Sequence, residues 1–336
     1  MIEQLPVSLP MFWAGVLALA ILIYVLLDGF DLGVGVLFAL NRNEGHRQQM
    51  MGSIAPVWDG NETWLIIVGT VLFGAFPVVY AIFLSAFYLP VALLLVALIL
   101  RGVAFEFRYK DARHRWIWDA GFVLGSIVAA FVQGAAIGAM VAGITVADGR
   151  FAGGPFDWLA PFPILCGIGL VIGYGLLGAG WLVLKTTGDL RDWAYQWLPR
   201  LMKAVIGVVV AALALTLLSD FRVVDRWLDQ PWLFAFPAFA AAAAWGLFRG
   251  VSDRRDWQPW LMASTLFVTA FAMLAGSFWP WIVPFHLTIA DAAAPTASLA
   301  FLYYGIGLVA IPVILVYTGV VYWIFRGKVS ADASYH

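Results

Sequence analysis

The chain has 336 residues, of which 63% are hydrophobic and 12% are charged, and its mean hydropathy is +0.91. Soluble domains carry about 45–50% apolar and about 25% charged residues, so this chain lacks the polar surface of a water-soluble fold. The net charge of −1 argues against nucleic acid as a partner, and the single cysteine, Cys166, excludes an intrachain disulfide. The composition predicts an all-α polytopic membrane protein.

Nine apolar segments reach the length of about 20 residues that a membrane-spanning helix needs. In chain order they are residues 11–38, 54–75, 77–104, 119–142, 161–184, 201–219, 231–248, 259–282 and 300–325. The N-terminal stretch lacks the basic region of a signal peptide, so the first segment is predicted to be a retained span.

The connections between these segments are short, which predicts a single membrane domain over residues 1–336. A weak similarity between the first and fifth segments predicts two four-helix halves, 11–142 and 161–282, and an additional helix over 300–325.

Loop charge predicts the orientation of the spans, because cytoplasmic loops are enriched in Lys and Arg. If nine spans alternate, one set of loops holds 15 of these residues and the opposite set holds three: Arg150, Arg222 and Arg226. The chain is therefore predicted to have its N-terminus outside and its C-terminus in the cytoplasm.

Five ionisable residues lie inside the predicted spans: Asp28 and Asp31 in the first, Asp59 and Glu62 in the second, and Arg101 in the third. Each costs about 2.5–3.5 kcal/mol at the centre of a spanning helix, so pairing is expected. Asp28 and Asp31 lie some 25 Å along the first helix, at a rise of 1.5 Å per residue, and the other three lie near the inner ends of their helices. All five are therefore predicted to share the cytoplasmic half of the membrane.

Two interpretations of this charge group remain open. It is either a salt-bridge network around Arg101 that only holds the helices together, or a proton-conducting group open to the cytoplasm. Four carboxylates against one Arg favour the second, because burial and a nearby cation act on a carboxyl group in opposite directions and can leave it able to exchange protons near neutral pH.

Buried haem usually takes His or Met axial ligands, and none of the four histidines lies in a predicted span. His46 and His114 fall in inner loops, His286 falls in an outer loop, and His336 is the last residue. The sequence shows no set of residues with metal-ligand spacing and no dinucleotide fingerprint. Pairs of glycines four residues apart, such as Gly29 and Gly33, predict close helix packing.

Three motifs in this order on the first three spans, "LLDGFDLGVG", "SIAPVWDGNETWLI" and "LRGVAFEFR", resemble subunit II of the cytochrome bd-type quinol oxidases. The short length resembles the cyanide-insensitive branch of that family. The resemblance implies a bacterial inner-membrane protein that acts as one subunit of an oxygen-reducing enzyme.

The resemblance also implies partners and cofactors. A partner, subunit I, would hold haems b and d and the quinol site, and this chain would bind no haem, would brace subunit I and would supply a cytoplasmic proton path. It leaves room for a small accessory membrane subunit and for a structural quinone or lipid in this chain. The substrates of the complex would be quinol and O2.

Carried over by motif, Asp28, Asp31, Asp59 and Arg101 match family positions tied to the proton path. Glu62 matches a position that varies between acid and amide. The residues expected to support the path are listed here: Trp58, Asn61, Trp64 and Glu106.

Two other functions stay open at the level of sequence. A free-standing proton-coupled secondary transporter predicts broken helices and polar groups in both halves, whereas the intramembrane charges here lie in the first half. A purely structural assembly subunit predicts that neutralising Asp59 lowers the yield of the complex but not its turnover.

Overall fold

The computed structural model describes residues 8–111, 113–219 and 223–329. Its long helices are α1 (Leu9–Phe38), α3 (Trp58–Ala75), α5 (Tyr88–Phe107), α6 (Arg115–Ala142), α7 (Pro161–Lys185), α8 (Gly188–Leu218), α10 (Ala235–Ser252) and α11 (Trp257–Phe278). The last spanning run joins α13 (Thr296–Leu302), the π-helix η4 (Tyr303–Ala310) and α14 (Ile311–Ile324).

Short elements connect the long helices. They are α2 (Glu44–Ile54), α4 (Pro77–Ala86), α9 (Val223–Asp229), α12 (Ile289–Ala292), η2 (Asp157–Leu159) and η3 (Pro231–Phe234). Two antiparallel hairpins complete the fold: β1 (Val146–Ala147) with β2 (Arg150–Phe151), and β3 (Trp281–Val283) with β4 (Leu287–Thr288).

Within the described residues, eight helical runs are long and apolar enough to cross a membrane. Helix α3, which carries Asp59 and Glu62, is more polar and makes the ninth. The predicted all-α polytopic fold is confirmed, with a helix count that agrees with the nine segments.

Three predicted boundaries were wrong. The second segment does not begin as a helix at residue 54, because α2 ends at Ile54 and a turn containing Pro56 precedes α3. The third segment is not continuous, because the chain breaks at Phe87 between α4 and α5. Pro90 accounts for this break, since its ring clashes with the carbonyl group four residues earlier, at Ala86.

The third wrong boundary is the start of α8. This helix begins 13 residues before the predicted residue 201, and Pro199 lies inside it. At 1.5 Å per residue its 31 residues span about 46 Å, more than the roughly 30 Å of the hydrocarbon core. Its first turns therefore extend beyond the apolar zone.

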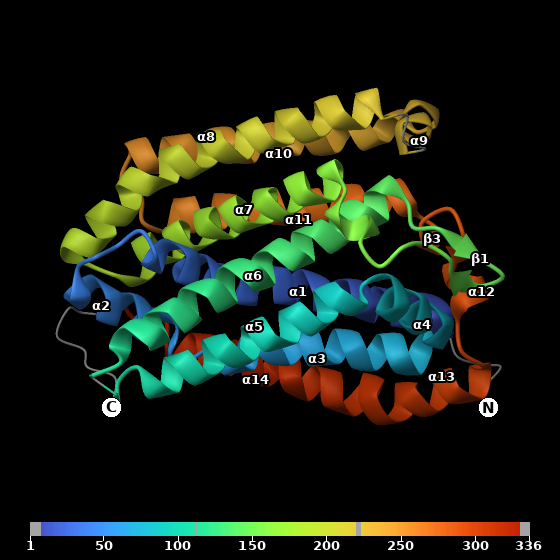
Figure 1. The fold of residues 1–336 in the computed structure, drawn as a ribbon, viewed down its shortest axis with the longest axis horizontal. Helices are drawn as coiled ribbons and strands as arrows, with labels where there is room; N and C mark the ends of the chain where they lie inside the picture. The colour runs from blue at the N-terminus through green and yellow to red at the C-terminus, as the bar shows by residue number, and fades with distance from the viewer. Residues whose placement is uncertain (1–7, 112, 220–222, 330–336) are drawn as a thin grey trace.

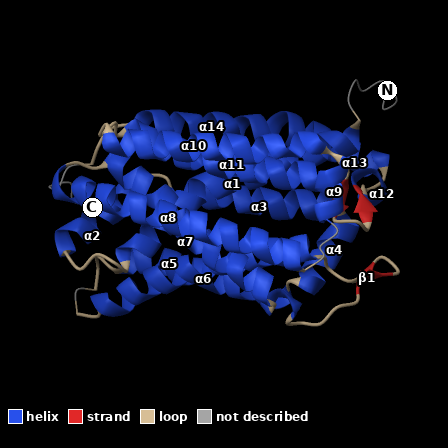
Figure 2. Ribbon diagram, turned by 90° about the horizontal axis from the view of Figure 1, so that it is seen from above, coloured by secondary structure: helices blue, strands red, loops and turns tan. Residues whose placement is uncertain are grey.

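The long helices run roughly along one axis, and the connections gather at the two ends of the bundle (Figures 1 and 2). One end holds α2 and the end of α14, and the other holds the start of α1, α4, α9, α12 and both hairpins (Figure 1). The 15 basic residues of the predicted inner loops belong to the end with α2. We call it the inner end.

Helix α1 lies at the centre of the packing, and its contact with α7 depends on glycine residues, which have no side chain. A Cβ atom on Gly33 would lie 1.8 Å from the carbonyl oxygen of Tyr174, and a Cβ atom on Gly178 would lie 2.5 Å from the carbonyl carbon of Gly33. The two backbones therefore touch, as the glycine spacing in α1 predicted.

The two predicted four-helix halves meet along α7. Helices α1 and α6 of the first half both pack on α7 of the second, and buried residues of both halves form one cluster around Phe30 and Trp181, whose rings stack at 3.9 Å. The division at residues 142 and 161 stays a prediction.

Candidate functional site

Four charged side chains from three helices meet in the inner half of the bundle. Arg101 of α5 donates from Nη1 to Oδ1 of Asp28 at 2.7 Å and to Oε1 of Glu62 at 3.0 Å. Its Nη2 atom lies 3.8 Å from Oδ2 of Asp31. Asp28 and Asp31 come from α1 and Glu62 comes from α3, so the cluster joins the first three long helices of the chain. We call these four residues the acid cluster.

The local sequence explains the geometry. Asp28 and Asp31 stand three residues apart and share one face of α1, directed at α5 and α3. Close packing is possible there because α6 carries Gly125, where a Cβ atom would lie 3.0 Å from Cβ of Arg101. The guanidinium group is thereby enclosed between helices.

The acid cluster is almost completely withdrawn from the surface. The side chains of Asp28 and Asp31 are 0% exposed, that of Arg101 is 1% exposed and that of Glu62 is 23% exposed. Three carboxyl groups face one guanidinium group. Oδ2 of Asp28, Oδ1 of Asp31 and Nη2 of Arg101 are buried and make no hydrogen bond within the described part of the chain.

Asn61 connects the acid cluster to the last helix. Its Nδ2 atom donates to Oδ2 of Asp31 at 2.7 Å, and its Oδ1 atom accepts a hydrogen bond from the hydroxyl group of Tyr322 at 3.0 Å. Tyr322 belongs to α14 and is 261 residues away in sequence. No local pattern in the sequence points to this contact, and the sequence analysis missed it.

The other predicted site residues lie outside the acid cluster. Asp59 and Glu106 are exposed, and neither carboxyl group forms a hydrogen bond or ion pair within the described residues. The ring of Trp58 packs 5.2 Å from that of Phe105, while Trp64 is buried at 1% exposure in the outer-half core. Of Glu62 and Glu106, Glu62 is the one beside Arg101.

A neutral polar chain continues from the acid cluster toward the outer side. Gln133 of α6 donates from Nε2 to the hydroxyl oxygen of Tyr24 at 2.9 Å, and its Oε1 atom accepts from the hydroxyl group of Tyr174 at 2.9 Å. Tyr24 lies one helical turn before Asp28 on α1. The polar interior therefore extends beyond the charged residues, through α6 and α7.

Comparison with known proteins decides the family. The family model described as cytochrome bd terminal oxidase subunit II matches residues 9–325. The chain belongs to this family. It is 30% identical to the cytochrome bd-I ubiquinol oxidase subunit 2 of Escherichia coli strain K12, with 92% of each chain covered. It is 34% identical to the cytochrome bd ubiquinol oxidase subunit 2 of Bacillus subtilis, over 62% of this chain and 63% of that one.

A solved structure agrees with the fold. A chain in the structure of the bd oxidase from Geobacillus thermodenitrificans superposes with a TM-score of 0.75 at 16% identity, covering 94% of this chain and 98% of that one. By its family match and its relatives, the protein is a subunit of an oxygen-reducing cytochrome bd oxidase complex, and it lies in the bacterial inner membrane.

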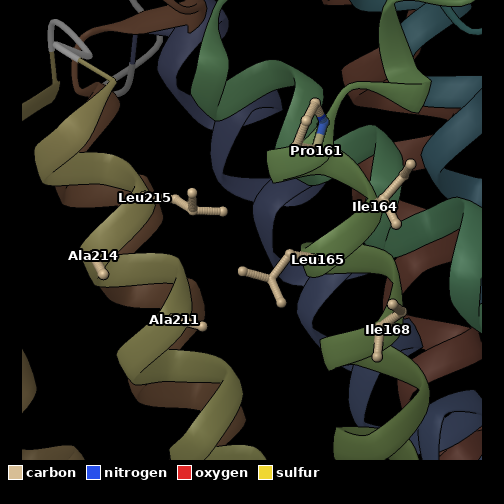
Figure 3. Close-up of a pocket in the computed structure, with 7 residues that line it drawn as sticks. All are labelled: Pro161, Ile164, Leu165, Ile168, Ala211, Ala214 and Leu215. Carbon is tan, nitrogen blue, oxygen red and sulfur yellow. The ribbon is translucent and has the colours of Figure 1, made fainter.

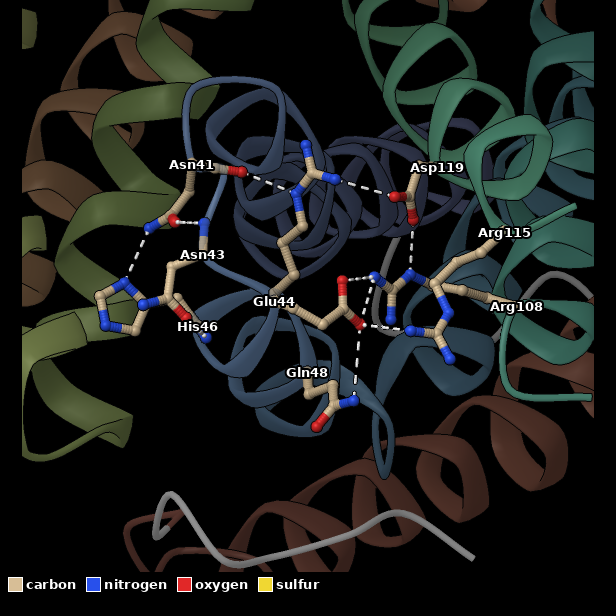
Figure 4. A network of polar contacts seen from close by, with 9 residues as sticks. Asn41, Asn43, Glu44, His46, Gln48, Arg108, Arg115 and Asp119 are labelled. Carbon is tan, nitrogen blue, oxygen red and sulfur yellow. Dashed lines mark hydrogen bonds and ion pairs between the residues drawn. The ribbon is translucent and has the colours of Figure 1, made fainter. Parts of the chain in front are cut away.

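The bd subunit has a second charged network at its inner end, which the sequence analysis treated only as loop charge. Arg108, 1% exposed, donates from Nε to Oδ1 of Asp119 at 2.5 Å and from Nη2 to both oxygens of Glu44 at 2.9 and 3.0 Å. Arg47 binds the other Asp119 oxygen at 2.8 Å, and Arg115 binds Glu44 at 3.2 Å (Figure 4). These contacts join α2 to α5 and α6.

The segment after α14 is attached across the same end. Lys185 at the end of α7 donates to the carbonyl oxygens of Phe325 and Gly327, and Gln49 of α2 donates to that of Val329 at 2.9 Å. Lys328 donates to Asp256, which precedes α11. Burial of Asp256 acts to raise its pKa, but the hydrogen bonds from Lys328 and Tyr195 and the charges of Lys328 and Arg191 together outweigh it, so the pKa lies below its ordinary value.

Two further features bear on cofactors. Within the described residues no group of three or more His, Cys, Asp or Glu side chains could hold a metal ion. His46 lies on α2 rather than in a loop, His114 precedes α6, and His286 lies between β3 and β4. His336 is outside the described residues.

An apolar groove of about 610 Å³ separates the outer halves of α7 and α8 (Figure 3). Its seven lining residues are apolar: Pro161, Ile164, Leu165, Ile168, Ala211, Ala214 and Leu215. These side chains offer no donor to the carbonyl oxygens of a quinone ring, so the groove is not assigned as a quinone site.

Proposed function

We propose that this chain is the haem-free subunit II of a membrane quinol:O2 oxidoreductase, that it braces the haem-bearing subunit I, and that it supplies a cytoplasmic proton path to the oxygen-reducing site. Reduction of O2 to water takes up one proton for each electron. Those protons have to cross low-dielectric protein to reach a buried haem.

The observation that carries the proposal is the graded burial of the acids at the inner end. Asp59 is exposed, Glu62 stands one turn further along the same face of α3 and is 23% exposed, and Asp28 and Asp31 are fully buried. An acid at each depth gives a proton successive acceptors between the surface of the chain and its interior. A network that only held helices together would not need Asp59, an exposed acid that pairs with no described residue.

The exposed position of Asp59 also indicates where subunit I packs. Around it, the same face of the bundle exposes large apolar side chains, among them Ile66 on α3 (68%) and Tyr317 on α14 (57%). A carboxylate on a lipid-facing helix costs several kcal/mol away from the interface, and charged side chains in membranes face protein or water instead. We therefore assign the face formed by α3 and α14 to the contact with subunit I, which would then border the entry of the path.

The haem assignment rests on the ligands that the chain offers. His46 lies in the short helix α2, His114 at the N-cap of α6 and His286 between β3 and β4, so none of the described histidines lies within a long helix. A haem iron in the apolar interior would need an axial His or Met there, and the buried Met202 of α8 packs within the apolar core. We assign the haems to subunit I for this reason and derive no electron-transfer step through this chain.

The test is Asp59→Asn, co-expressed with subunit I, with haem content and quinol-driven O2 consumption measured per assembled complex. We expect normal haem content and turnover lowered by more than about tenfold, equivalent to a barrier increase above roughly 1.4 kcal/mol. The matched control is Asp189→Asn, which neutralises an exposed acid at the inner start of α8.

Two outcomes would contradict the proposal. Loss of haem and of the complex would show that Asp59 is a structural contact to subunit I. Normal assembly with normal turnover would remove Asp59 from the proton path.

A further inference from the structure

Tyr322 of α14 is linked to the acid cluster through Asn61, and neither the motifs nor the family comparison assigns it a role. Its hydroxyl group donates to Oδ1 of Asn61, whose Nδ2 atom donates to Oδ2 of Asp31. This short chain of hydrogen bonds joins α14 to α1 through α3.

A third contact supports the direction of these hydrogen bonds. Nδ2 of Asn61 also faces the carbonyl oxygen of Leu27 at 3.4 Å. A carbonyl oxygen can only accept, so turning the amide over would place two oxygens against each other at Leu27. The Tyr322 hydroxyl group adds to this orientation by donating to the amide oxygen at 3.0 Å.

This orientation determines which oxygen of Asp31 can carry a proton. Oδ2 already accepts from Asn61 and lies 3.8 Å from Nη2 of Arg101, whose positive charge disfavours a proton on that oxygen. Oδ1 of the same carboxyl group is buried and makes no hydrogen bond with described residues. A proton on Asp31 would therefore sit on Oδ1.

The charge balance of the acid cluster indicates that such a proton is present. Three ionised carboxyl groups and one guanidinium group would leave two uncompensated negative charges at this depth, and buried charges without partners are strongly disfavoured. Asp28 and Glu62 lie 2.7 and 3.0 Å from the same Arg101 nitrogen, whereas Asp31 lies 3.8 Å from the other one. Asp31 is thus the acid that the cation stabilises least as an anion.

The groups that face Asp31 come from each helix packed around it. Asp28 lies on α1, Asn61 and Glu62 on α3, Arg101 on α5 and Tyr322 on α14. From α7 comes the ring of Trp181, 6.2 Å from that of Tyr322. Arg101 is the sole cation among these groups.

We infer that Tyr322 is a positioning residue for proton transfer: by orienting the Asn61 amide it holds Oδ2 of Asp31 as an acceptor and reserves Oδ1 as the atom that takes up and releases the proton. Uptake of a proton that has entered by way of Asp59 and Glu62 forms the O–H bond on Oδ1 and makes the carboxyl group neutral. Release breaks that bond, passes the proton onward along the proposed path to the oxygen-reducing site and restores the carboxylate, while Arg101 keeps its charge throughout. The inference rests on the proposed proton path, because it names the atom at which that path stores its proton.

The first test is Tyr322→Phe in the assembled oxidase, with Tyr88→Phe as the matched control at an exposed position at the start of α5. Without the hydroxyl group the Asn61 amide is held in this orientation only by the 3.4 Å contact to Leu27, so it can turn and accept from a protonated Asp31, which favours the neutral acid. We expect normal haem content and a pH profile of O2 consumption displaced toward higher pH by up to about one unit, the size of one hydrogen bond. A profile that coincides with those of the wild type and of Tyr88→Phe would overturn the inference.

The second test does not depend on turnover. The infrared C=O stretching band of a protonated carboxylic acid should be present in the resting complex, should disappear in Asp31→Asn and should change frequency in Tyr322→Phe. A band that survives in Asp31→Asn would place the proton on another residue and overturn the inference. If Asp31→Asn does not assemble, an unchanged frequency in Tyr322→Phe overturns it by itself.

These measurements separate the inference from the proposed function. Normal turnover in Asp59→Asn would remove the entry residue, yet the infrared band of Asp31 would still report where the buried proton lies. A lost band in Asp31→Asn together with normal turnover in Asp59→Asn would retain the inference and refute only the proposed entry.

Discussion

Replacing Arg101 by Gln tests whether this one cation holds the acid cluster together. The substitution leaves Asp28, Asp31 and Glu62 without the guanidinium group that lies 2.7, 3.8 and 3.0 Å from them. Removing one partner of a buried ion pair typically costs about 3–5 kcal/mol, because the remaining charge stays buried. Since the free energy of unfolding of a whole domain is only about 5–15 kcal/mol, this loss of stability should be measurable in the purified complex.

The assay is thermal denaturation of the assembled oxidase, followed by circular dichroism, together with the yield of complex per cell mass. We expect Arg101→Gln to lower the midpoint by several degrees or to abolish assembly. Arg326→Gln, which removes an exposed cation just after α14, should leave both quantities unchanged.

A second substitution distinguishes electrostatics from lost packing. Asp28 is the acid nearest to Arg101, so adding Asp28→Asn to Arg101→Gln removes one of the stranded charges and should recover about 0.5–3 kcal/mol, the range of coupling energies between residues in contact. A double variant no more stable than Arg101→Gln, or a single variant as stable as the wild type, would refute the charge argument.

Two further predictions concern packing and the inner end. Gly33→Ala should prevent assembly or strongly lower the denaturation midpoint, because its Cβ atom would lie 1.8 Å from a carbonyl oxygen of α7. The control is Gly15→Ala, whose Cβ atom would have no atom within 4 Å and which should be neutral. Equal midpoints for the two variants would show that α1 and α7 do not touch. Because the folded-state pKa of Asp256 lies below its ordinary value of 3.8, its contacts stabilise the protein above about that pH, and the stabilisation is lost as the pH falls through the lowered pKa. In Asp256→Asn, stability should therefore fall less steeply as the pH is lowered below about 4. An unchanged dependence of stability on pH in that range would contradict the lowered pKa of Asp256.

Most of the architecture could be predicted from the sequence because hydropathy and loop charge are local properties. A segment of about 20 apolar residues is stable in a bilayer whatever its neighbours are, so each span can be predicted from its own sequence. Some interruptions of helices could also be predicted in this way. Pro90 explains the interruption at Phe87, although Pro199 inside α8 shows that proline alone does not end a helix.

The composition of the acid cluster was only partly predictable. Their spacing placed Asp28 and Asp31 on one helix face. Because charged carboxylates in a membrane cost free energy, a cationic partner was expected, and Arg101 is that partner. Spacing could not show that Glu62 lies beside Arg101 while Asp59, three residues earlier on the same face, is exposed, because that depends on the depth at which α3 packs against its neighbours.

The sequence by itself determined a polytopic helical protein, the concentration of basic residues in alternate loops, the family and a set of buried acids. Each of these follows from residues close together in the chain. Only the tertiary structure decided that Tyr322 reaches Asn61, that Arg108 binds Glu44 and Asp119, and that Glu106 stays outside the cluster. These contacts join residues on different helices. Which side chains meet there is set by helix rotation and depth within the packed bundle, and no local pattern encodes either.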